Sequence, residues 1–139
     1  MLIFGLAGRM DSKKPHHYVD KHRAQMVLNK LSSLFDKGCL PFCAANASYD
    51  AQHHFHFSEA DIVNYIVNNV NINNYQQTNY DLNNRKCVEH FVFQACDPLN
   101  NDKYIYIKIQ STFSGNRIRH LAITSFKPDQ QTAKTRRMK

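Results

Sequence analysis

The sequence lacks the residue patterns on which several common enzyme classes depend. It has four glycines and no tryptophan. None of the patterns GxxxxGK[ST], GxGxxG or HExxH occurs, which excludes the usual ATP- and NAD-binding loops and the zinc-protease helix. No run approaches the roughly 18 apolar residues that a membrane-spanning helix needs. We therefore expect no cofactor and no membrane segment.

Cysteines and acidic residues are also few. The four cysteines are irregularly spaced, which does not match the disulfide framework of a secreted domain and favours a reducing, cytoplasmic location. Eleven acidic residues stand against 18 lysines and arginines, which gives a formal net charge of +7. Such an excess favours a polyanionic partner, above all nucleic acid, and simple solubility is the alternative explanation.

A chain of 139 residues has the length of one domain and can bury a sizeable core. We expect a flexible N-terminal segment over residues 1–14 and a single folded domain over residues 15–127. The polar, basic stretch over residues 128–139 is expected to be a disordered tail.

Helical periodicity dominates the first half of the chain. Apolar residues at helical spacing predict helices over residues 18–36 and 59–70, and a shorter helix over residues 44–51. Ser58 and Asp61 resemble a capping box at the start of the second long helix. The Asn-rich stretch over residues 68–84 is too polar to bury much surface, and we expect a loop there.

The second half predicts strands. β-rich runs over residues 88–93, 104–110 and 118–126 are separated by turns at Asp97 to Asp102 and Ser114 to Asn116. Helices followed by an antiparallel meander correspond to an α+β fold, with the N-terminal helices packed on a small C-terminal antiparallel sheet.

Alternation in the middle strand separates core from surface. It places Ile105, Ile107 and Ile109 on one face, and a strip of phenol, ammonium and amide groups on the other: Tyr104, Tyr106, Lys108 and Gln110. Such a strip can stack bases and bind phosphate, although an ordinary solvated sheet face has the same pattern. Neighbouring strands add His90, Arg117, Arg119, His120 and Lys127.

This mixture of residues suits RNA cleavage without a metal. The reaction needs a base for the 2′-hydroxyl proton, an acid for the leaving 5′-oxygen and cations for the phosphate charge. His90 and His120 are candidates because histidine titrates near neutral pH, although a histidine in a strand is more often structural. A zinc site built from Cys39, Cys43, His53, His54 and His56 is a weaker alternative, because its spacing matches no standard finger.

The segment from Tyr104 to Ile109 (YIYIKI), followed by Thr124-Ser125-Phe126-Lys127, resembles the MqsR mRNA interferases. The resemblance extends over nearly the whole chain, from Pro15-His16 onward, as a match of layout and short motifs. It implies a RelE-like ribonuclease fold, RNA as substrate and a cognate antitoxin protein as partner.

Carried over by position, the resemblance implies functional roles for Tyr106 and Lys127. The chain departs from the family at two other positions. His90 stands where the family has a functional glutamine, and Gln76, after Tyr75, stands where it has a loop lysine. We therefore expect His90, Tyr106 and Lys127 to be catalytic and assign RNA contacts to Tyr75, Gln76, Tyr104, Lys108, Arg117, Arg119 and His120, with no metal ligands.

The leading hypothesis is thus a metal-independent endoribonuclease, of the toxin type found in toxin–antitoxin pairs, that cleaves single-stranded RNA by 2′-hydroxyl attack. The departures at Gln76 and His90 leave open a degenerate protein that binds RNA or DNA without cleaving it. A protein-interaction effector domain is the third possibility.

Overall fold

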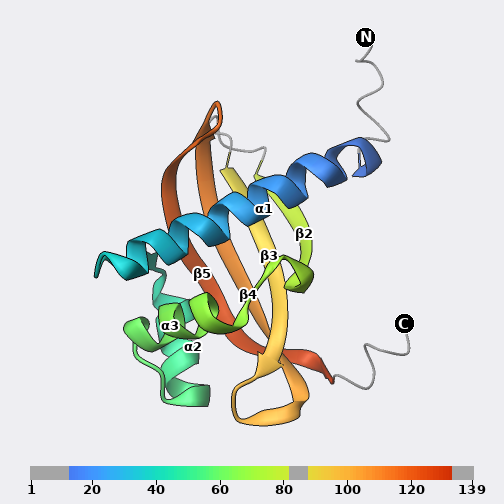
Figure 1. Ribbon diagram of the computed structural model, residues 1–139. Coiled ribbons are helices and arrows are strands. Elements are labelled where there is room, and N and C mark those ends of the chain that lie inside the picture. Colours follow the sequence, from blue (N-terminus) through green and yellow to red (C-terminus); the bar gives the residue numbers. More distant parts are fainter. Residues whose placement is uncertain (1–12, 82–87, 133–139) are drawn as a thin grey trace.

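The helices precede the four longer strands along the chain, as the sequence predicts, and one short strand lies between the first two helices. The computed structural model describes residues 13–81 and 88–132 (Figure 1). The elements are α1 (Lys13–Asp36), β1 (Phe42–Cys43), α2 (Ala45–Phe55), α3 (Glu59–Asn69), a 3₁₀ turn (Ile72–Asn74), β2 (Tyr75–Asp81), β3 (Val88–Asp97), β4 (Asn100–Ser114) and β5 (Arg117–Thr132). The fold is therefore α+β.

The sheet is mixed, which corrects the expectation of a purely antiparallel one. Its strand order is β1-β5-β4-β3-β2, and β1 runs parallel to β5 through the pairs Phe42↔Ala122 and Cys43↔Ile123. All other neighbours are antiparallel. A strand of two residues after Pro41 is too short to show any periodicity, so it could not be predicted from the sequence.

A strand also replaces the expected Asn-rich loop. β2 pairs with β3 at the end of the sheet, so polar side chains on its outer face do not need burial. Its inner face is less polar: the Tyr75 ring packs on Phe93 at a centroid distance of 6.0 Å. The prediction of a loop was wrong over Tyr75–Asp81, because it weighed average polarity and not the alternation of faces; residues 82–84 of that range lie outside the described part of the chain.

The three helices cover one face of the sheet (Figure 1). The core between the two layers is built from the buried sides of α1, α2 and α3 and from the inward residues of β3, β4 and β5. At the start of α3, Ser58 Oγ accepts from Asp61 N at 3.1 Å and Asp61 Oδ2 accepts from Ser58 N at 2.9 Å, which confirms the capping box. No helix of residues 13–81 or 88–132 covers the other face of the sheet.

Two polar contacts hold α1 against the β2–β3 end of the sheet. Tyr80 donates a hydrogen bond to Asp20, and Arg23 forms an ion pair with Glu89. Burial raises the pKa of Glu89, the Arg23 charge lowers it, and the nearby Asp20 carboxylate raises it; the net shift is upward. The position of α1 therefore depends on buried charges as well as on apolar packing.

β5 is longer than the sequence predicts. It continues to Thr132, which pairs with Lys103, and so includes five residues of the stretch that we expected to be a disordered tail. The polar, basic composition of this stretch was the reason to expect a tail. Pro128 is tolerated within β5 because β1 pairs with β5 only at Ala122 and Ile123, so Pro128 has a neighbouring strand on one side only. Residues 1–12 and 133–139 lie outside the described part of the chain.

Candidate active site on the open face of the sheet

The strip of polar residues on β4 lies on the helix-free face, as the alternation predicts. Ile105, Ile107 and Ile109 are fully buried under the helices. Tyr104, Tyr106, Lys108 and Gln110 are partly exposed on the opposite face. Successive residues of β4 therefore face the core and the polar surface in turn.

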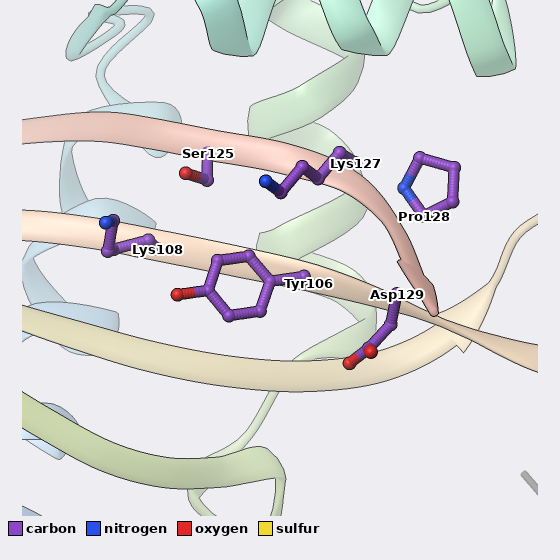
Figure 2. A pocket seen from close by; sticks show the side chains of 6 residues that line it. All are labelled: Tyr106, Lys108, Ser125, Lys127, Pro128 and Asp129. Carbon is purple, nitrogen blue, oxygen red and sulfur yellow. The ribbon is translucent and has the colours of Figure 1, made fainter. Parts of the chain in front are cut away.

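A shallow pocket of about 310 Å³ lies on this face, between β4 and β5. It is lined by Tyr106, Lys108, Ser125, Lys127, Pro128 and Asp129 (Figure 2). Tyr106 pairs with Lys127 across the two strands, and Lys108 pairs with Ser125. The Lys127 ammonium lies 5.5 Å from the centre of the Tyr106 ring, within cation–π range. Two lysines and one carboxylate thus surround a phenol.

A β-bulge at Thr124 determines which side chains reach this pocket. Ile109 pairs with Ile123 but Lys108 pairs with Ser125, so Thr124 is an extra residue in β5. Without it, strict alternation from the buried Ile123 would turn Ser125 and Lys127 toward the helices. With it, Phe126 is buried while Ser125 and Lys127 face the pocket. The bulge is therefore what places Lys127 beside Tyr106.

Asp129 and Gln94 are site residues that the sequence analysis missed. Gln94 pairs with Tyr106 across β3 and β4, and its Nε2 donates to Asp129 Oδ2 at 2.7 Å. This hydrogen bond fixes a carboxylate at the edge of the pocket. The signal was hidden because Asp129 lies beyond Pro128, in the segment assigned to the tail, and because Gln94 has an inconspicuous polar side chain within an apolar strand.

Tyr106 is protonated at neutral pH. Burial raises the pKa of its hydroxyl, and the negative charge of Asp129 raises it further. A neutral phenol can donate a proton or a hydrogen bond but cannot serve as a base. Asp129 is therefore the proton acceptor of the pocket, Tyr106 is a donor, and Lys108 and Lys127 supply positive charge.

His90 does not join Tyr106 and Lys127. It lies on the same open face, but its cross-strand neighbours are Gln110 and Asn79. Gln94, not His90, is opposite Tyr106, and His90 lies four positions before Gln94, which corresponds to about 13 Å along the strand. The three expected catalytic residues therefore do not form one cluster.

The expected RNA-binding residues divide into three groups. Tyr104 and Lys108 lie on the open face near the pocket. Tyr75 faces the helices, with its hydroxyl 2.6 Å from Thr78 Oγ1, and is not placed to stack on a base, whereas Gln76 is exposed. The third group is exposed at the far end of β5 and comprises Arg117, Arg119 and His120; Arg117 is ten residues from Lys127, or about 33 Å of strand.

The alternative zinc site is not assembled in the described residues, where no three histidine, cysteine or acidic side chains gather in a metal-binding group. Burial, followed by the Glu59 charge, raises the pKa of the Cys43 thiol to about 11. A thiol that stays protonated at neutral pH is a poor zinc ligand. His53, another residue of this alternative site, stacks its ring on that of Tyr49, with the ring centroids 5.5 Å apart.

No helix in the described ranges is both long and apolar enough to cross a membrane.

Comparison of the chain with protein-family models, with curated proteins and with solved structures finds no match.

Proposed function

We propose that this chain is a metal-independent endoribonuclease whose active site is the pocket between β4 and β5. The observation that carries the proposal is the convergence of Tyr106, Lys127 and Asp129 in one pocket that also includes Lys108. These side chains supply the proton acceptor, the proton donor and the cations that 2′-hydroxyl attack on a phosphodiester requires. The resemblance to the MqsR interferases points to the same Tyr106 and Lys127.

In the proposed reaction Asp129 takes the proton of the 2′-hydroxyl, and the 2′-oxygen forms a bond to the adjacent phosphorus. The bond from phosphorus to the 5′-oxygen breaks, and Tyr106 donates its proton to that oxygen. Lys127 and Lys108 neutralise the charge on the non-bridging oxygens. The products are a 2′,3′-cyclic phosphate and a 5′-hydroxyl, and proton exchange with water restores both side chains.

His90 acts outside this chemistry in the proposal. It lies too far along β3 to share a proton with Tyr106 or Lys127, and it faces the same side of the sheet as the pocket. Its place fits contact with a nucleotide that flanks the cleaved bond. The proposal extends to a RelE-like fold, a cytoplasmic location and a cognate antitoxin that is acidic where it meets this face.

The test is cleavage of a labelled single-stranded RNA and its all-deoxy counterpart in the presence of EDTA. The wild-type protein should cut only the RNA, because DNA lacks the nucleophile. Tyr106→Phe, Lys127→Ala and Asp129→Asn should each lower the rate by about 10²- to 10⁴-fold, the range for general acid–base groups. Tyr49→Phe and Lys103→Ala are the matched controls, because both residues lie outside the pocket lining and neither is assigned an RNA contact.

Cutting of the deoxy substrate, or full loss of activity in EDTA, would overturn the mechanism. RNA binding without cleavage by the wild-type protein would instead support a degenerate, RNA-binding protein. If RNA bound no more tightly than another polyanion of the same charge, the protein-interaction alternative would be favoured.

A further inference from the structure

A second pocket lies on the other side of the sheet, between α1 and the start of β5. It has a volume of about 410 Å³ and is lined by Met26, Asn29, Lys30, Arg117 and Ile118. This size falls in the range of small-molecule sites. The proposed reaction does not use the pocket, and three of its five lining residues belong to α1.

Every polar side chain that lines this pocket can donate hydrogen bonds. Lys30 and Arg117 are exposed, and neither has a carboxylate within ion-pair distance in the described part of the chain. Asn29 Oδ1 already accepts from Gln25 Nε2 at 2.9 Å, which leaves the Asn29 amide nitrogen as a donor. The pocket therefore suits a ligand that is anionic and rich in acceptors.

The remaining surface of the pocket is apolar. Met26 and Ile118 come from opposite walls, and a thioether and a branched alkyl group together favour a flat, apolar ligand group over a hydrated ion. A nucleotide combines all three requirements: a phosphate for the two cations, a base face for the apolar residues and base carbonyls for the amide. An oligoglutamate peptide supplies charge and acceptors but has no flat apolar face for Met26 and Ile118.

We infer that this pocket between α1 and β5 is a second nucleotide-binding site, separate from the pocket on the open face. It binds one nucleotide through Lys30 and Arg117, with the base against Met26 and Ile118. The nucleotide has two possible sources, either a free mononucleotide or one unit of an RNA chain. The inference does not require that the protein cleave RNA.

The exposed edge of β5 offers a path for an RNA that occupies both pockets. β1 covers β5 only at Ala122 and Ile123. Arg119 and His120 are exposed between that short contact and Arg117. An RNA chain that leaves the second pocket therefore meets a cation and an imidazole before it reaches the open face.

The experiment uses the Lys127→Ala protein, so that any RNA probe stays intact whether or not the wild type is a ribonuclease. The methyl signals of Met26 and Ile118 are followed by NMR during titration with uridine monophosphate, and separately with an oligouridylate of about 12 nucleotides, a length that single-strand-binding domains cover. Lys30→Gln and Arg117→Gln should each weaken binding about tenfold, the loss expected for one charge-assisted hydrogen bond. Lys37→Gln is the control, because Lys37 is an exposed cation directly after the end of α1 and does not line the pocket.

Saturable shifts with uridine monophosphate would assign the site to free nucleotides. Shifts with the oligonucleotide alone would assign it to a unit of an RNA chain. The slope of log affinity against log salt concentration should then be smaller in the Lys30→Gln/Arg117→Gln double variant, by the amount expected for about two lost contacts between a cation and a phosphate. The inference is overturned if neither probe moves the two methyl signals. It is also overturned if Lys37→Gln weakens binding as much as the pocket variants, or if an oligoglutamate peptide shifts the signals as strongly as RNA.

Discussion

Replacement of Phe126 by leucine should weaken the fold and the pocket together. Phe126 is fully buried between the two residues that face the pocket, Ser125 and Lys127. Its ring meets Phe55 and Tyr65 edge-to-face, at centroid distances of 5.7 and 5.9 Å, and lies 5.8 Å from the Phe57 ring. The side chain thus anchors the pocket end of β5 to α2 and α3.

The magnitude follows from these ring contacts. Each aromatic pair contributes about 0.5–1.5 kcal/mol beyond buried area, and leucine loses the two edge-to-face pairs and the tilted one. We expect Phe126→Leu to lower the free energy of unfolding by about 2–3 kcal/mol when the small volume change is included. A domain of ordinary stability, about 5–15 kcal/mol, remains folded after such a loss.

The assay is urea denaturation followed by circular dichroism, with RNA cleavage measured in the absence of urea. Phe35→Leu is the control, because Phe35 also packs against the core but has no aromatic ring partner in the described residues. Phe126→Leu should cost more than the control and should also lower the cleavage rate, since a displacement of about 1 Å at a site can cost 10²-fold. Equal stability losses in the two variants would refute the argument that these ring pairs anchor β5.

Three further outcomes are expected. Ser58→Ala should lower the free energy of unfolding by about 1 kcal/mol through loss of the helix cap, measured by thermal melting against Ser32→Ala. The folded-state pKa of Glu89 lies above its ordinary 4.5, so its contribution to stability is present below that pH and is lost as pH rises through the folded-state value. Urea titrations should therefore show Glu89→Gln gaining stability relative to wild type between acidic and neutral pH; an unchanged difference would contradict the upward shift. Deletion of Thr124 should retain cleavage, because regular alternation from the buried Ile123 then still places Ser125 and Lys127 on the open face; loss of RNA cleavage in this variant would contradict the assigned bulge.

The parts of the fold that the sequence predicted are those in which local pattern and tertiary packing agree. The Ser58–Asp61 cap begins α3 with a local hydrogen-bond exchange that needs no partner from elsewhere. In β4, the alternation of Ile105, Ile107 and Ile109 with polar residues indicates which face of the strand is buried. These features depend on neighbours within a few residues, so they can be inferred without knowledge of the fold.

The parts that could not be predicted depend on strand partners far away in the sequence. The Thr124 bulge exists only relative to β4, and it decides which side of β5 carries Lys127. Asp129 enters the pocket only because β5 continues past Pro128 beside β4, where Gln94 can reach it. The candidate site was therefore only half predictable: Tyr106 and Lys127 from motif and alternation, Asp129 and Gln94 from the structure alone.

The position of β5 in the sheet also constrains when the protein can fold. β5 is the last strand of the described residues but lies between β1 and β4 in the sheet. During synthesis from the N-terminus, the buried sides of α1, α2 and α3 must wait for Ile123 and Phe126 before their core is complete. The closing contacts join distant residues, as in Phe42↔Ala122, which is a feature of slow-folding topologies. The fold is therefore complete only once β5 has been synthesised, so a chain that stops before β5 leaves the apolar sides of its helices and of β4 uncovered and is prone to aggregate.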